Sequence, residues 1–238
     1  MERLQKTIAN SGFTSRRKAE ELIVKGLVKV NGEVIDTLGF KVDSKDEIEI
    51  EGIILKKDTK VYYLLNKPRG VVCTTSDDKG RATIVSLIDT NARIYPVGRL
   101  DYDTTGLIIL TNDGDFANMM MHPSNNIDKV YVAKINNKIS GEHIKALKNG
   151  VIIDNKKTSP AKIKIKDYDR KTNTSIVEIT IHEGRNHQVK KMFEVLGYEV
   201  LKLKREKIAF LTLDGMSSKQ YRYLTPKEIK KLYVLANK

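Results

Sequence analysis

Apolar residues in the first part of the chain follow a helical period. They recur every three or four residues within 4–9 and again within 19–23, which predicts two short helices. Gly12 is suited to end the first helix, and Thr14 or Ser15 can cap the second. The pattern therefore predicts a pair of helices at the N-terminus.

Strand-like alternation follows this helical pair. Residues 27–30 alternate as a strand does, and Asn31-Gly32 is a strong signal for a tight turn. The polar run 56–60 is a candidate linker. We therefore expect a small module of two helices plus strands over residues 1–60, and a second domain over residues 61–238.

Beyond residue 60, strands and helices follow one another irregularly. Strands are predicted over 61–65, 107–110 and 175–182, and helices from 115 to before Pro123 and over 187–196. Thr225-Pro226-Lys227-Glu228 is a capping box that opens a last helix. This order favours an α+β fold with a mainly antiparallel or mixed sheet over a doubly wound one.

The net charge of the chain indicates what kind of partner it binds. The chain has 43 Lys and Arg against 30 Asp and Glu, a net charge of +13. Folding needs no such excess, so it points to nucleic acid first and to an anionic membrane second. A membrane is disfavoured, because no apolar run approaches the roughly 20 residues of a spanning helix. Cys73 is the sole cysteine and there is no signal-peptide pattern, so we expect a cytoplasmic protein. We also expect it to be a monomer.

Several kinds of nucleotide, catalytic and metal site are excluded because their sequence motifs are absent. The chain has no phosphate-binding loop, no dinucleotide-binding glycine motif and no nucleophile elbow, and its four histidines lack zinc-ligand spacing. We therefore expect neither a metal nor a cofactor. Two polar segments carry the remaining candidates: 98–106, which runs into the predicted strand 107–110, and 182–191. From the residues alone, the first could be a turn and the second a solvated helix start.

Four segments, in order along the chain, resemble the ribosomal small-subunit and large-subunit (RsuA/RluB-type) pseudouridine synthases. They are Asn66-Lys67-Pro68-Arg69-Gly70, the run from Gly98 to Gly114, Lys129-Val130-Tyr131-Val132, and the run from Glu183 to Met192. Residues 1–50 are similar to the small RNA-binding module that precedes the catalytic domain in this family. The resemblance spans nearly the whole chain.

This resemblance implies roles for particular residues. Asp101 would be the nucleophile, and Lys190 would pair with it and keep it ionised. Tyr131 would offer its ring to a uracil flipped out of the RNA, and its hydroxyl to the proton that leaves the base. Without the motifs, Tyr131 would be interpreted as a core tyrosine and Lys190 as a solvated lysine.

Basic residues would hold the RNA. By resemblance and charge they are Arg99, Arg16, Arg17, Lys18, Lys67 and Arg185. The last prediction concerns substrate choice. The N-terminal module and the basic run 202–207 are similar to the large-subunit enzymes, which favours 23S ribosomal RNA near the peptidyl-transferase region, whereas 187–192 is more similar to the small-subunit enzymes and 16S RNA. A non-catalytic RNA-binding assembly protein is the remaining alternative.

Overall fold

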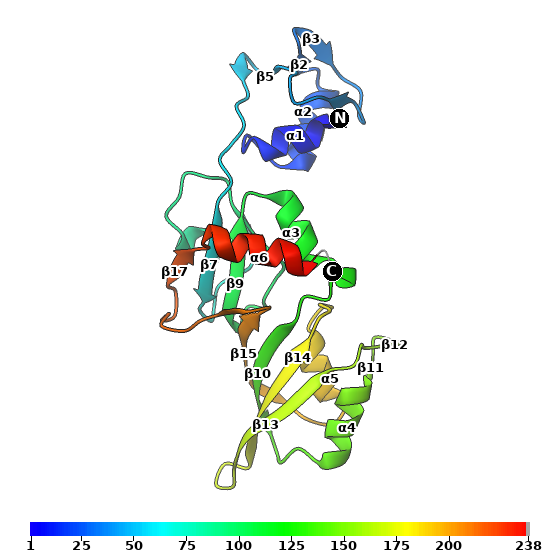
Figure 1. Cartoon of the computed structure of the whole chain (residues 1–238), viewed down its shortest axis with the longest axis vertical. Coiled ribbons are helices and arrows are strands. Elements are labelled where there is room, and N and C mark those ends of the chain that lie inside the picture. The colour runs from blue at the N-terminus through cyan, green and yellow to red at the C-terminus, as the bar shows by residue number, and fades with distance from the viewer. Residues whose placement is uncertain (237–238) are drawn as a thin grey trace. The chain divides into compact units, whose positions relative to one another are not determined.

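The computed structural model describes residues 1–236 and divides into two compact units (Figure 1). The first unit comprises Met1–Val61 together with two short segments, Thr90–Ile94 and Asn112–Gly114. The second contains the remaining described residues.

The first unit begins with the two predicted helices, α1 (Leu4–Asn10) and α2 (Arg16–Val24). The Ser15 hydroxyl caps α2 by accepting from the backbone N–H of Lys18 at 3.2 Å. Its strands are β1 (Glu2–Arg3), β2 (Val28–Val30), β3 (Glu33–Ile35), β4 (Lys41–Val42), β5 (Ile48–Ile50) and β6 (Ile53–Ile54). The apolar faces of both helices close a small core over these strands.

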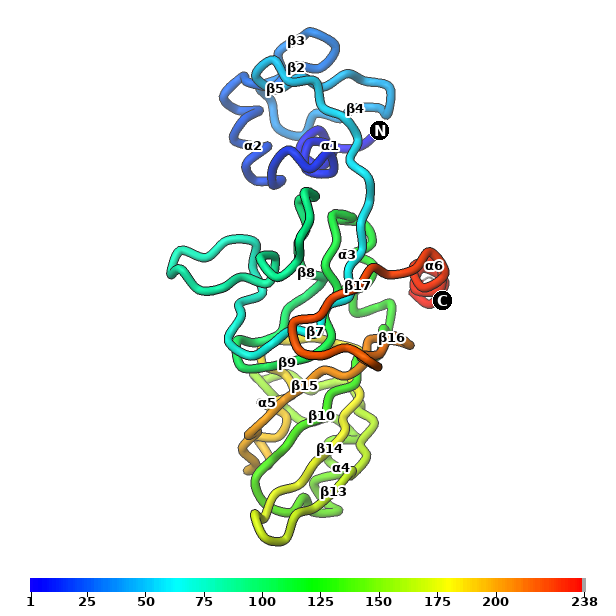
Figure 2. The backbone as a smooth tube through the Cα atoms, turned by 90° about the vertical axis from the view of Figure 1, so that its left-hand side faces the viewer, coloured from blue at the N-terminus to red at the C-terminus, as the bar shows by residue number. Residues whose placement is uncertain are grey.

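The second unit is built on one large sheet. Figure 2 shows the path of its strands, whose order is β13-β14-β10-β15-β9-β7-β17. The bounds are β7 (Tyr62–Lys67), β9 (Thr105–Thr111), β10 (Lys129–Asn136), β13 (Lys162–Asp169), β14 (Thr174–Ile181), β15 (Val200–Ile208) and β17 (Tyr221–Tyr223). The short strands β8 (Tyr95–Pro96) and β16 (Leu211–Thr212) pair with β9 and β15. Neighbours are antiparallel except β9 and β15, so the α+β fold with a mixed sheet is confirmed.

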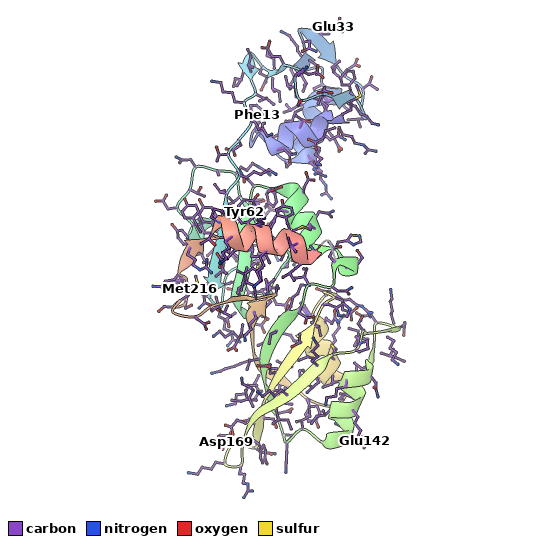
Figure 3. All side chains as sticks on the ribbon, in the orientation of Figure 1. Phe13, Glu33, Tyr62, Glu142, Asp169 and Met216 are labelled. Carbon is purple, nitrogen blue, oxygen red and sulfur yellow. The ribbon has the colours of Figure 1, made fainter. Side chains whose placement is uncertain are left out.

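Helices cover parts of this sheet. They are α3 (Gly114–Met121), α4 (Gly141–Asn149), α5 (Gln188–Glu194) and α6 (Pro226–Ala236), with 3-10 turns at Val85–Leu87 and Pro123–Asn125 and a hairpin of β11 (Ile152–Ile153) and β12 (Lys156–Lys157). Both α3 and α6 pack on β7 and β9, and Tyr62, labelled in Figure 3, meets Phe116 edge-on at 5.0 Å between ring centroids. The predicted capping box opens α6, since Glu228 N–H donates to Thr225 at 3.2 Å. None of the helices within 1–236 has the length and apolar character to cross a membrane.

The contact between β9 and β15 requires glycine. Gly106 has φ +110°, and a Cβ there would lie 2.2 Å from the backbone oxygen of Arg205. Only a residue without a side chain permits so close an approach. Gly106 therefore allows the parallel pairing that joins the two halves of the sheet, in which Arg205 is the register partner of Gly106.

Candidate active site

The backbone of the loop 98–104, which precedes β9, is held by a buried lysine. Lys67 is fully buried at the end of β7, and its ammonium donates to the backbone oxygens of Asp101 at 3.0 Å and Thr104 at 2.9 Å. A third bond reaches the oxygen of Pro68 at 3.2 Å. Burial lowers the pKa of Lys67, and the nearby carboxylates of Asp101 and Asp103 oppose that shift. The lysine thus fixes the backbone that carries Asp101.

The side chain of Asp101 meets two basic groups. Lys190 Nζ lies 3.4 Å from Asp101 Oδ2, and His187 Nε2 lies 3.4 Å from Asp101 Oδ1. Lys190 contacts Asp103 more closely, at 2.6 Å, and this hydrogen bond holds the pKa of Asp103 below its usual range. The Asp101 carboxylate is 27% exposed and is therefore reachable from solvent. One lysine is shared by two carboxylates of the same loop.

The start of α5 aims both basic groups at the loop. His187 precedes the helix with φ +54°, a left-handed conformation uncommon for a residue with a side chain. The side chain of Gln188 accepts from the backbone N–H of Arg185 at 2.9 Å and donates to Glu183. These bonds tie the turn before α5 together, so Lys190, one helical turn further, also faces Asp101.

Tyr131 and Arg205 form a buried pair on neighbouring strands. They face each other in the register of β10 and β15, next to a bulge between Val130 and Tyr131. Arg205 Nη1 donates to the Tyr131 hydroxyl at 3.3 Å, and Nε donates to the backbone oxygen of Leu107 at 2.7 Å. Arg205 is 3% exposed and its Nη2 has no hydrogen-bond partner. An unpartnered buried donor costs about 1–3 kcal/mol.

A cavity of about 430 Å³ joins these groups. Its polar lining comprises Arg99, Asp101, Thr104, Lys129, Tyr131, Arg185, Asn186, His187, Gln188 and Arg205. Apolar side chains such as Ile109, Leu203 and Ile208 complete it. Burial, together with the nearby charge of Arg205, lowers the pKa of Lys129 to about 8. A hollow of this size with a carboxylate, an aromatic ring and several cations suits a planar polar ring attached to an anionic chain.

Comparisons with known proteins agree with this geometry. A model of the RNA pseudouridylate synthase domain matches residues 61–195, and a model of the S4 domain matches residues 2–48. The chain belongs to the RNA pseudouridine synthases. It consists of an S4 domain followed by a synthase domain, and its activity is the isomerisation of uridine in RNA.

Relatives match this synthase along nearly its whole length. The ribosomal large subunit pseudouridine synthase B of Bacillus subtilis is 53% identical over 100% of this chain and 98% of its own. An uncharacterized RNA pseudouridine synthase of Aquifex aeolicus is 41% identical over 97% of this chain and 93% of its own. A crystal structure of a pseudouridylate synthase, 34% identical, superposes with a TM-score of 0.71 and covers 98% of this chain and 100% of that one.

The structure of the synthase brings together three of the residues predicted from sequence. Asp101 and Tyr131 line one cavity, and Lys190 contacts Asp101 from α5. Arg99 is exposed and lies at the same cavity. Arg185 also lines it, but its guanidinium donates to the backbone oxygens of Lys156 and Lys157, which leaves it less free for phosphate.

One predicted RNA contact is wrong. Lys67 has no exposed surface, and its three donors are used by backbone oxygens, so it supports the loop instead of binding RNA. In the S4 domain, Arg16, Arg17 and Lys18 are exposed at the start of α2, and Lys18 pairs with Glu21 at 2.9 Å. Their RNA contacts stay a prediction.

Sequence reasoning missed three cavity residues of the synthase. His187 and Lys129 stood in the family motifs, but no periodicity separates them from ordinary surface cations, and Arg205 stood in the basic run 202–207. A usable signal existed for Arg205, since Leu203, Arg205 and Ile208 are the inward positions of one strand. Among residues 1–236, no cluster of three His, Cys, Asp or Glu side chains could hold a metal ion.

Proposed function

We propose that this synthase converts a uridine of 23S ribosomal RNA, near the peptidyl-transferase region, to pseudouridine with Asp101 as the nucleophile. The observation that carries the chemistry is the meeting of Asp101 and Tyr131 in one cavity, with Lys190 and His187 on the carboxylate. The choice of RNA is supported by the 53% identical relative, whose name is ribosomal large subunit pseudouridine synthase B.

The reaction begins with a base taken out of its stack. Flipping costs a few kcal/mol, which phosphate contacts on a protein of net charge +13 offset. Arg99, exposed beside the cavity, is placed to hold the RNA strand at the vacated position. The uracil then enters the cavity beside the Tyr131 ring.

Asp101 attacks the flipped nucleotide, at the sugar or at the base ring, and the bond between uracil N1 and the ribose breaks. Lys190 and His187 orient the carboxylate for this step, because each contacts a different oxygen. The base turns and rejoins the ribose through C5, and the bond that Asp101 formed breaks, which returns the carboxylate to its starting state. The C5 proton leaves, with the Tyr131 hydroxyl as the nearby proton-transfer group, and N1 gains a proton, so that the product is an isomer.

The two domains have different proposed tasks. We propose that residues 1–60 bind RNA through Arg16, Arg17 and Lys18, and that residues 61–238 carry the catalysis. All three proposed catalytic groups belong to one chain, which supports a monomeric enzyme. The single cysteine and the ribosomal substrate support a cytoplasmic location.

The test offers purified enzyme both unmodified ribosomal RNAs and maps pseudouridine by carbodiimide-dependent stops of reverse transcription. We expect a stop in 23S RNA near the peptidyl-transferase region, and none with the Asp101→Asn variant. A stop confined to 16S RNA would overturn the substrate, and an unchanged stop with Asp101→Asn would overturn the nucleophile.

A further inference from the structure

Arg205 is a buried cation that has no role in the mechanism proposed above. We propose that Arg205 is a positioning residue: it holds the Tyr131 hydroxyl oxygen as an acceptor and directs the hydroxyl proton toward the cavity. The proposal rests on the role of Tyr131 in the proposed function. It adds a residue that acts through Tyr131 on the flipped base.

The direction of the hydrogen bond follows from chemistry. An arginine guanidinium only donates, so the contact of 3.3 Å between Arg205 Nη1 and the Tyr131 hydroxyl makes the phenolic oxygen an acceptor. The hydroxyl hydrogen must then point elsewhere, and the described residues give it no acceptor within hydrogen-bonding distance. Because Tyr131 lines the cavity, a base that enters there is the natural partner of this hydrogen.

The Arg205 guanidinium is also held by a second hydrogen bond, away from Tyr131. Arg205 Nε donates to the backbone oxygen of Leu107 at 2.7 Å, across the parallel junction of β9 and β15. That junction exists because Gly106 admits the Arg205 backbone, where any Cβ would lie 2.2 Å from its oxygen. Two bonds in different directions therefore lock the guanidinium plane against the Tyr131 ring, whose centroid is 5.8 Å away.

A purely structural role explains this arrangement poorly. Arg205 is 3% exposed, and its partners among the described residues are the Leu107 oxygen and the Tyr131 hydroxyl, not a carboxylate. Its Nη2 lacks any acceptor, so a nonpolar side chain of similar volume would fill the site without burying an uncompensated charge. A protein that keeps a buried, partly unsatisfied cation beside its active-site tyrosine uses the charge there. The unpartnered Nη2 is a second donor on the same group, available to an acceptor that arrives with substrate.

The experiment is a double-mutant cycle on the full chain with a short 23S fragment as substrate, read as saturated single-turnover rate and as half-saturating RNA concentration. The variants are Arg205→Met, Arg205→Lys, Tyr131→Phe and the double variant of Arg205→Met with Tyr131→Phe. Arg170→Met, which removes an exposed arginine at the turn between β13 and β14, is the matched control. Melting temperatures report folding for each protein.

We expect Arg205→Met and Tyr131→Phe each to lower the saturated rate about 100-fold, with half-saturating RNA within about twofold of the unaltered enzyme. Because both changes break the same interaction, the double variant should be less than about threefold slower than Tyr131→Phe alone. Arg205→Lys, whose ammonium can still donate to the hydroxyl, should recover about tenfold of the loss. Arg170→Met should change neither quantity.

Three outcomes would overturn the proposal. Losses that multiply in the double variant would show that Arg205 acts independently of Tyr131. A full rate for Arg205→Met beside a slow Tyr131→Phe would refute Arg205 alone and leave the proposed function intact. A full rate for Tyr131→Phe would refute the role of Tyr131 and this inference with it. If Arg205→Met does not fold, Arg205→Lys takes its place in the cycle: losses from Arg205→Lys and Tyr131→Phe that multiply in their double variant would refute the proposal.

Discussion

Polar groups in two regions of the active site, which we call the loop side and the strand side, are held in place by different interactions. On the loop side, which comprises Arg99, Asp101, Asp103, His187 and Lys190, side chains are exposed or half-buried, and the two carboxylates contact the side chains of Lys190 and His187. On the strand side, which comprises Lys67, Tyr131 and Arg205, side chains are buried, and the cations donate to backbone oxygens and to a phenol.

This difference predicts that the loop side can rearrange and that the strand side is rigid. A partly exposed ion pair is worth little free energy and is screened by salt, so the loop side can exchange partners when RNA arrives. A buried cation bonded to backbone oxygens has a fixed geometry, and removing it leaves those oxygens unsatisfied. We therefore expect loop-side changes to alter chemistry with little effect on stability, and strand-side changes to alter both.

The largest effect is expected at Asp101. Asp101→Asn keeps the shape of the side chain but removes the nucleophile, so the turnover rate should fall more than about 100-fold, or about 2.7 kcal/mol of barrier. RNA affinity should be nearly unchanged, because phosphate contacts dominate binding. Single-turnover rates and filter binding measure the two quantities. Retention of more than about a hundredth of the turnover would end the assignment.

Next is Lys190, which contacts both carboxylates of the loop. Lys190→Met should lower the turnover rate about 30-fold, about 2 kcal/mol, because Asp101 loses a cation that orients it. The melting temperature should change by less than about 2 °C, since the pair is partly exposed. Asp103→Asn is the comparison: it frees Lys190 for Asp101 and should cost less than about threefold. A larger loss with Asp103→Asn than with Lys190→Met would contradict this order.

Lys67 tests the strand side. Lys67→Met leaves the backbone oxygens of Asp101 and Thr104 without their donor, which should reduce the free energy of unfolding by about 2–3 kcal/mol. For a chain of this size the melting temperature should fall by roughly 5–10 °C. Turnover should fall about tenfold as the loop loosens. Thermal unfolding and turnover are measured together, and an unchanged melting temperature would refute the contrast between the two sides.

A smaller effect is expected far from the chemistry, in the S4 domain. Replacing Arg16 and Arg17 with Gln removes two exposed cations at the start of α2. The half-saturating RNA concentration should rise roughly fivefold, and the slope of log affinity against log salt should fall by about 2. The saturated rate should stay within about twofold. Arg170→Gln, another exposed arginine, is the control, and an equal effect there would show a general charge effect only.

The smallest effect should come from an ion pair outside the cavity. Arg222 contacts Glu228 at 2.7 and 2.9 Å, and its hydrogen bonds lower the pKa of Glu228 to about 2. A carboxyl whose pKa is lower in the folded than in the unfolded chain stabilises the fold above the unfolded value of about 4.3, and that stability is lost as pH falls toward 2. Glu228→Gln should therefore flatten the decline of stability between these pH values. An equally steep decline would refute this linkage.

Local order could be predicted from the sequence because it depends on neighbouring residues. The helices at the N-terminus, the Ser15 cap and the capping box at Thr225 follow from periodicity and hydrogen bonding within one turn. The buried strand 107–110 follows from its unbroken apolar run. The polar loop before it already contained Asp101, and the motifs named Tyr131 and Lys190.

Only the tertiary structure decided which cations are buried. In the sequence, Lys67 and Arg205 resemble surface residues. Strand β15 is the central strand that joins both halves of the sheet, although its many lysines make its sequence look like an exposed segment. The physical reason is that burial of a charge depends on partners from distant segments. The oxygens of Asp101 and Leu107 and the hydroxyl of Tyr131 become partners only when β7, β9, β10 and β15 lie in one sheet.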